Sequence, residues 1–256
     1  GAFWEFGQPD WDHTKLFVLF GVAEDHDSNP IKIGLGKLKA RGAKVIGINP
    51  IRTGYNAIAD EWLGITPGTD MALILSLVHV LLKAGRIDLD YLARYTNAPV
   101  LLNADPASPD HGLFLRDADG KPLVIDRNTG RPAAFDSPGI RPDLSATHEV
   151  DGITHRPVFH TLATRYLDPR YAPEAVAETC GIPAARIRAL AGEIARAAFD
   201  TPVILDRPWT DFRGERHDTM IGRPVSFHAM RGISAHANGF QTARALHILQ
   251  ILLGAV

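Results

Sequence analysis

The sequence contains a single cysteine, Cys180, among its 256 residues. One cysteine excludes an intrachain disulfide and any metal or iron–sulfur site built from several cysteines of this chain. Basic residues are not in excess, because 27 lysines and arginines stand against 29 aspartates and glutamates, so nothing points to nucleic acid. The most apolar stretch, residues 71–82, is interrupted by Ser76 and His79 and is shorter than the ~20 residues that cross a bilayer.

Familiar catalytic signatures are missing as well. The sequence has no Gly-x-Ser-x-Gly motif and no Walker loop, and none of its 11 histidines forms a His-Glu-x-x-His pair. His79 and His247 lie in apolar helical segments and are better explained as core residues. The low cysteine content fits a reducing compartment and favours the cytoplasm over the periplasm, although the sequence decides neither.

What is present is an ordinary globular composition, 45% hydrophobic and 22% charged, with a clear α/β pattern. Residues 16–20 form a continuous apolar run, residues 31–41 can form a helix, and residues 43–48 form a second apolar run. This order predicts a βαβ unit with a right-handed crossover. With further helices expected at 71–84 and 88–95, we predict a doubly wound, mostly parallel sheet with helices on both faces.

The middle of the chain has a different composition. Residues 103–157 are rich in Asp, Pro, Gly and Arg, and turn signals at Gly120 and Gly152 predict a small β-rich insertion of hairpins. We therefore expect a Rossmann-like domain formed by residues 1–102 and 158–220, with this insertion at residues 103–157. Residues 221–256 are expected to be the truncated start of a second domain. The strongly apolar segment 245–256 has nothing after it, so we expect a piece of a longer protein; a C-terminal helix docked in the core is the alternative.

Two loops after predicted strands are candidate ligand sites, because α/β sheets bind ligands beyond the carboxyl ends of their strands. The loop 21–30 precedes a helix whose free N–H groups suit phosphate. The alternative is an acidic connection in which Ser28 only caps the helix. After the second strand, Asn49 can bind a ribose or base edge and Arg52 a phosphate, unless this is an ordinary turn with a solvated arginine.

Two later segments are further candidates. In the turn at 67–70, Gly68 allows close backbone approach and Asp70 can accept two parallel hydrogen bonds from guanine. The alternative is a helix cap at Thr69 or Asp70 with no ligand. Residues 230–242 form a glycine-containing polar segment before the last helix, suited to a heterocycle or an anion, unless it is a surface loop with capping by Asn238 or Thr242.

The order of these motifs resembles the middle of the dimethyl sulfoxide reductase family of molybdopterin oxidoreductases over nearly the whole chain. The resemblance is carried by FVLFG at 17–21, SNP at 28–30, GAKVIGINP at 42–50, RT at 52–53, AD at 59–60, PGTD at 67–70, YAPEAVAETCGIP at 171–183 and GISAHANG at 232–239. The insertion is similar to the branch that contains thiosulfate, polysulfide, tetrathionate and sulfite enzymes.

The resemblance implies the catalytic subunit of a molybdenum enzyme that binds two molybdopterin guanine dinucleotides and carries out two-electron redox chemistry on a small substrate, such as a sulfur oxyanion. It implies cofactor contacts at Gly21, Ala23, Asp27, Ser28, Asn49, Pro50, Arg52, Thr53, Gly68, Asp70, Gly232, Ser234 and Gln241. It makes Arg231 and His236 candidates for the wall of the substrate pocket, with no catalytic residue and no metal ligand in this chain. It also implies a 4Fe-4S cluster upstream, together with two partners: an iron–sulfur electron-transfer subunit, and a membrane anchor subunit.

This sequence departs from the family at several points. The family often has Asp where Asn49 stands, its cluster cysteines have no match here, and Cys180 is not its molybdenum ligand. We therefore expect the chain alone to bind no molybdenum and to show no turnover. Two alternatives stay open: a non-catalytic respiratory-complex subunit of the same fold, and a plain nucleotide-binding module such as the middle domain of a thiamine-diphosphate enzyme.

Overall fold

The computed structural model describes residues 9–22, 31–52 and 54–255, except for the side chain of Arg231. The chain forms two compact units. The first, here called the sheet unit, contains residues 1–87, 168–203 and 221–256, and the second, the insert unit, contains residues 88–167 and 204–220. Among the described helices, none combines the length and the apolar character needed to cross a membrane.

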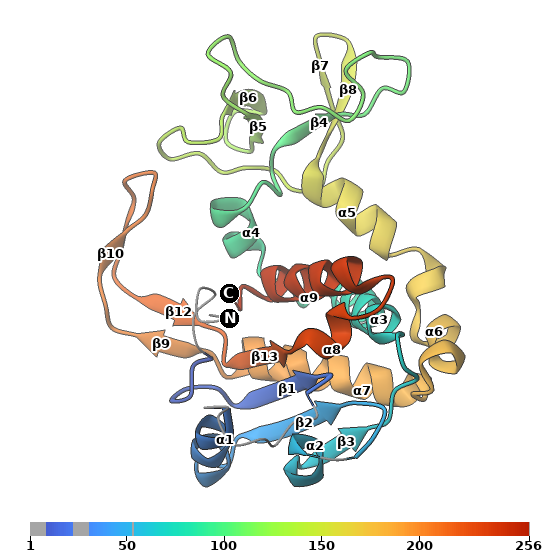
Figure 1. The fold of residues 1–256 in the computed structure, drawn as a ribbon. Helices are drawn as coiled ribbons and strands as arrows, with labels where there is room; N and C mark the ends of the chain where they lie inside the picture. Colours follow the sequence, from blue (N-terminus) through green and yellow to red (C-terminus); the bar gives the residue numbers. More distant parts are fainter. Residues whose placement is uncertain (1–8, 23–30, 53, 256) are drawn as a thin grey trace. The chain divides into compact units, whose positions relative to one another are not determined.

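The sheet unit is built on four parallel strands. They are β1 (Leu16–Phe20), β2 (Lys44–Ile48), β3 (Glu61–Leu63) and β13 (Val225–Ala229), in the order β13-β1-β2-β3 (Figure 1). Every residue of β1 is buried, as expected for a central strand that is covered on both faces. In the register, Phe20 pairs with both Ile48 and Ala229, and Ile48 pairs with Leu63. The four carboxyl ends are therefore aligned at one edge.

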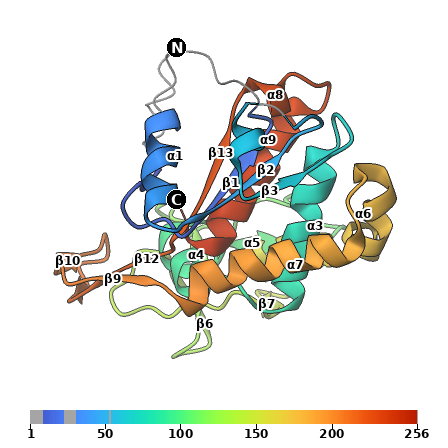
Figure 2. The same cartoon turned by 90° about the horizontal axis from the view of Figure 1, so that it is seen from below.

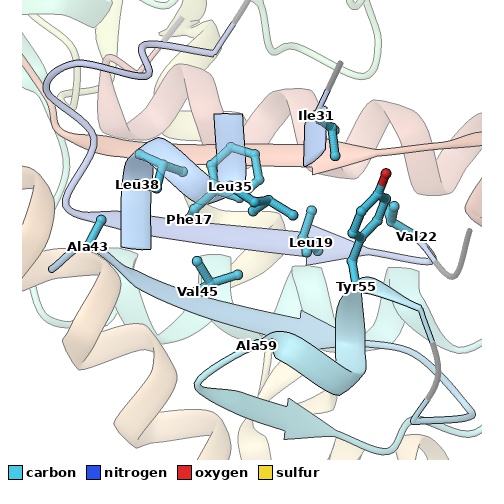
Figure 3. Close-up of a cluster of buried hydrophobic side chains, with 10 residues drawn as sticks. All are labelled: Phe17, Leu19, Val22, Ile31, Leu35, Leu38, Ala43, Val45, Tyr55 and Ala59. Carbon is cyan, nitrogen blue, oxygen red and sulfur yellow. The ribbon is translucent and has the colours of Figure 1, made fainter. Parts of the chain in front are cut away.

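One face of the sheet is covered by α1 (Ile31–Ala40) and the short α2 (Tyr55–Ile58). Alternate side chains of β1 point to this face and pack against the apolar side of α1 (Figure 3). The cluster contains Phe17, Leu19, Val22, Ile31, Leu35, Leu38, Ala43, Val45, Tyr55 and Ala59. Burial of this cluster fixes the predicted βαβ unit.

Helices α3 (Asp70–Lys83), α7 (Ala184–Ala195) and α9 (Gly239–Leu253) cover the other face (Figure 2). Helix α3 is the centre of this layer, because it contacts α7, α9 and α6 (Pro173–Cys180). Three short helical segments complete the unit, at Pro169–Tyr171, Arg196–Asp200 and α8 (Arg231–Ser234). The predicted class, a parallel sheet with helices on both faces, is confirmed.

The insert unit contains short antiparallel sheets and two helices. Its sheets have the orders β4-β8-β7, β5-β6 and β10-β11. Its elements are α4 (Leu89–Tyr95), β4 (Leu101–Asn103), β5 (Leu123–Asp126), β6 (Arg131–Ala134), β7 (His148–Val150), β8 (Ile153–Pro157), α5 (Val158–Tyr166), β10 (Trp209–Thr210) and β11 (Arg216–His217). A further pair consists of β9 (Val203–Leu205) and β12 (Met220–Gly222). A small core around Val100, Val124 and Ile140 holds β4 and β5.

The structure divides the chain differently from the predicted boundaries. Residues 221–256 belong to the sheet unit, because β13 pairs with β1 over five residues and α9 packs on α3. The β-rich insertion is also larger than residues 103–157, since α4, α5 and residues 204–220 belong to the same compact unit. His79 is buried in α3 as expected, whereas His247 is exposed on α9.

Candidate functional site

The polar candidates lie where the aligned strands end. The backbone N–H of Gly21, directly after β1, donates to the Ile48 carbonyl at 3.0 Å. The backbone N–H of Asn49, directly after β2, donates to the Leu63 carbonyl at 3.2 Å. The loop after β1 therefore begins beside the end of β2, and the loop after β2 begins beside the end of β3. Open α/β sheets bind ligands at this position.

Asn49 is held firmly in this edge. Its side chain is buried, and its Oδ1 accepts a hydrogen bond from the Ile51 N–H at 3.4 Å. Its carbonyl accepts a hydrogen bond from Trp62 Nε1 at 2.9 Å. Pro50 and Arg52 are exposed, so the arginine is available to an anion at this edge.

The turn 66–70 connects β3 to α3 and presents Asp70. Gly68 has a φ of +79°, a left-handed conformation that favours glycine. Thr69 occupies the N-cap position, but its hydroxyl donates to the Thr66 carbonyl at 2.7 Å and does not cap the helix. Asp70 is only 6% exposed, and burial raises the pKa of its carboxyl. Burial of the Asp70 carboxylate costs free energy, and the Thr69 side chain makes no bond that would explain the turn as a helix cap. Both observations favour a ligand-binding role for this turn.

The segment from Met230 to Gly239, here called the bridging segment, contacts two of these loops. A Cβ at Gly232 would lie 2.8 Å from the Gly21 carbonyl oxygen, so the two backbones touch and only glycine fits. At its other end, Asn238 Nδ2 donates to the Gly68 carbonyl at 3.2 Å. His236 lies beside the same turn, with Nδ1 at 3.5 Å from the position of a Cβ on Gly68.

Two contributors to the site were not among the predicted site residues. Asn56 is fully buried, and its Nδ2 donates to the Val22 carbonyl at 2.7 Å, which fixes the start of the loop after β1. A Cβ on Gly47 would lie 2.1 Å from Asn56 Oδ1. An isolated glycine inside an apolar strand indicates such a close approach, so Gly47 was the available signal. Asn238 was expected as part of the polar segment 230–242, with a helix cap as the alternative, and its side chain makes no cap bond.

Gly21, Asn49 and Asp70 therefore lie at one edge of the sheet, with Gly68 and Gly232 beside them. Ser234 and Gln241 are exposed on α8 and α9, respectively. The other predicted contacts, Ala23, Asp27, Ser28 and Thr53, lie outside the described residues, as does the side chain of Arg231. The roles of all these residues stay predictions.

A shallow hollow of about 260 Å³ lies at the opposite edge, among residues 12–15 and 41–43. Its cations already have protein partners. Lys15 Nζ donates to the Thr201 carbonyl at 3.0 Å, and an Arg41 nitrogen donates to the Trp11 carbonyl at 2.7 Å. This hollow does not compete with the carboxyl edge as the candidate site.

In the described part of the chain, one group of potential metal ligands stands close together: Asp211, Glu215 and His217. Arg94 lies among them, with its guanidinium 2.8 Å from His217 Nε2 and 3.6 Å from Asp211 Oδ2. Asp211 Oδ1 also accepts hydrogen bonds from two backbone N–H groups of its own turn. The group is explained as an ion-paired turn.

The carboxyl edge combines glycines that permit close backbone approach, a buried acceptor carboxylate and the start of a long helix. Such a set lies where open α/β sheets bind their ligands, and it defines an α/β domain with a candidate ligand site at the carboxyl edge of a parallel sheet. The sequence profile of the molybdopterin oxidoreductase family matches residues 4–256. The chain belongs to this family, and the plain nucleotide-binding module is thereby set aside.

Known proteins agree with this assignment. The chain is 45% identical to a sulfite dehydrogenase subunit of Allochromatium vinosum, over all of this chain and 27% of that protein. It is 29% identical to the alpha subunit of perchlorate reductase from Dechloromonas aromatica, over 73% of this chain and 24% of that protein. The fold is similar to acetylene hydratase from Pelobacter acetylenicus, with a TM-score of 0.54 and 18% identity over 97% of this chain and 22% of that one. The chain thus spans about a quarter of these relatives' length.

Proposed function

We propose that the carboxyl edge of the sheet holds the guanosine and pyrophosphate end of a molybdopterin guanine dinucleotide, in the catalytic subunit of a molybdenum-dependent oxidoreductase. The observation that carries this proposal is Asp70. A buried carboxylate with a raised pKa costs stability, and guanine offers two parallel N–H donors that offset the cost.

Several residues of this edge share the work of binding. Asp70 accepts the hydrogen bonds of the guanine N1–H and exocyclic amine, while Asn49 and Arg52 face the ribose and the phosphates. Glycine at positions 21, 68 and 232 lets the backbone approach the ligand. By resemblance, further contacts come from Ala23, Asp27, Ser28, Pro50, Thr53, Ser234 and Gln241.

The bound molybdenum supplies two-electron oxidation or reduction, and this chain supplies position and electrostatics. We propose a sulfur oxyanion as the substrate, because the relative at 45% identity is named as part of a sulfite dehydrogenase. Arg231 and His236 are proposed for the wall of the substrate pocket. A 4Fe-4S cluster upstream in the parent protein, an iron–sulfur electron-transfer subunit, and a membrane anchor subunit complete the proposed electron path.

Calorimetric titration of the chain with GDP, IDP and ADP tests the guanine site. IDP lacks the exocyclic amine, and ADP lacks both donors of that edge, so we expect affinity to fall in the order GDP, IDP, ADP. Loss of one hydrogen bond to a charged group costs about 1.5–3 kcal/mol, or roughly 10- to 150-fold in affinity. Asp70→Asn removes the acceptor pair and is expected to abolish the preference. Equal affinities in the original chain would contradict the proposal.

The role of the parent protein needs its own measurement. We expect purified full-length protein to contain molybdenum and to oxidise sulfite with an artificial electron acceptor. Full-length protein that folds and binds GDP but contains no molybdenum would favour the non-catalytic alternative.

A further inference from the structure

The bridging segment, residues 230–239, ties together two loops that are far apart in the sequence. Its first contact is at Gly21, where the side chain of Ile233 packs against the end of β1 and a Cβ on Gly21 would lie 2.9 Å from Ile233 Cγ2. Ile233 is itself buried. This end of the segment is therefore fixed by packing.

The second contact is at the turn 66–70. Asn238 occupies the N-cap position of α9, where an Asn side chain ordinarily bonds the helix's own first N–H groups. Here the side chain makes no cap bond and donates to the Gly68 carbonyl at 3.2 Å, across 170 residues of sequence. Its backbone carbonyl still begins the helix by accepting from the Thr242 N–H at 2.9 Å. The amide of Asn238 is thus used on the turn and not on its own helix.

Gly68 has a left-handed φ of +79° in that turn, and Asp70 follows two residues later. Glycine at a positive φ gives the backbone the widest conformational freedom of any residue, so its carbonyl needs an external partner to be fixed. A carboxylate that accepts two parallel N–H donors must be placed accurately, because both bonds weaken steeply with misalignment.

We propose that Asn238 is a positioning residue for guanine selectivity. Its amide holds the Gly68 carbonyl and thereby keeps the turn in the conformation that presents Asp70. The inference rests on the proposed function and extends it, because it assigns part of the base selectivity to the bridging segment. A change at Asn238 then acts on the ligand through Asp70.

The test compares Asn238→Ala and Asn238→Asp with the original chain. Asn238→Asp is nearly isosteric but has no N–H donor, so it removes the same bond without opening a cavity. A matched control is Asn128→Ala in the insert unit, because Asn128 Nδ2 also donates to a glycine carbonyl, that of Gly139, at 3.4 Å. Titration with GDP and ADP measures base selectivity, and thermal unfolding measures stability. Hydrogen exchange of the chain without nucleotide measures how firmly the turn 66–70 is held.

We expect both Asn238 variants to bind GDP about five- to tenfold more weakly, the worth of one neutral hydrogen bond. We expect ADP affinity and the melting temperature to change little, and Asn128→Ala to leave both nucleotides unaffected. Amide exchange of residues 66–72 should accelerate in the empty Asn238 variants, because the turn loses its tie.

Each contrary outcome has a separate meaning. If the original chain does not prefer GDP, the proposed function fails and this inference fails with it. If the original chain prefers GDP and the Asn238 variants keep the full preference, the inference alone is overturned. An equal loss of GDP and ADP binding with a lower melting temperature would also overturn it, because it would show a purely structural role.

Discussion

Acidification is expected to destabilise the sheet unit through His228. This residue lies on β13 opposite Leu19, and its ring stacks on Phe17 with 6.4 Å between centroids. In the described part of the chain its Nε2 is buried without a hydrogen-bond partner, and burial lowers the pKa of His228 from 6.5 to about 4. The unfolded chain therefore binds a proton between these two values that the folded chain rejects, so stability falls as pH falls through this window.

The magnitude follows from the two pKa values of His228. The free energy of unfolding falls by about 1.4 kcal/mol per pH unit, but only below the unfolded-state pKa of 6.5. Moving from pH 7.5 to pH 5 therefore costs about 2 kcal/mol, and the loss near pH 4 approaches about 3 kcal/mol. Urea unfolding of the chain at pH 7.5 and pH 5 measures it. In His228→Phe the difference between the two pH values should shrink by about 2 kcal/mol.

The control for this experiment is His247→Gln, since His247 is exposed on α9 and its change should leave the pH difference intact. The reasoning is refuted if His228→Phe keeps the full difference, or if His247→Gln removes as much of it as His228→Phe does.

Three further outcomes are expected. Burial raises the pKa of Asp70, so its charge destabilises the empty fold above that pKa, and Asp70→Asn should raise the melting temperature at pH 7; a decrease would contradict this. GDP affinity should fall as pH drops through the raised pKa of Asp70, whereas GDP affinity that stays constant in a calorimetric series at decreasing pH would show that the carboxylate is not the acceptor. Gly47→Ala should lower the free energy of unfolding by about 1–3 kcal/mol, because the new Cβ would meet Asn56 Oδ1. Gly36→Ala, at a position on α1 with open space around it, should raise the free energy of unfolding by up to about 1 kcal/mol. If urea unfolding gave both changes the same sign, the close approach at Gly47 would be contradicted.

Local sequence patterns predicted the elements well, because each depends on neighbouring residues. The apolar runs that became β1 and β2 lie close to their predicted positions, and the turn at Gly152 connects β7 and β8 as expected. The third parallel strand, β3, contains only Glu61–Leu63. Its few residues give little periodicity from which to locate it.

Long-range pairing explains what the sequence did not reveal. The position of β13 beside β1 depends on strand order, which no local pattern encodes, so the sequence did not indicate that residues 221–256 join the sheet unit. The bond from Asn238 to Gly68 joins residues 170 apart, so the local pattern around Asn238 could not indicate it. The polar edge itself was predictable, because parallel strands place their carboxyl ends together.

The central claim is that a guanine nucleotide lies across the carboxyl edge of the parallel sheet. Hydrogen exchange of the chain with saturating GDP tests it most directly, since the two edges of the sheet serve as site and control. We expect slower exchange in residues 49–52, 66–72 and 231–242, and unchanged exchange at residues 12–15 and 41–43 around the opposite hollow. Protection at that hollow, or at neither edge while GDP binds, would contradict the account.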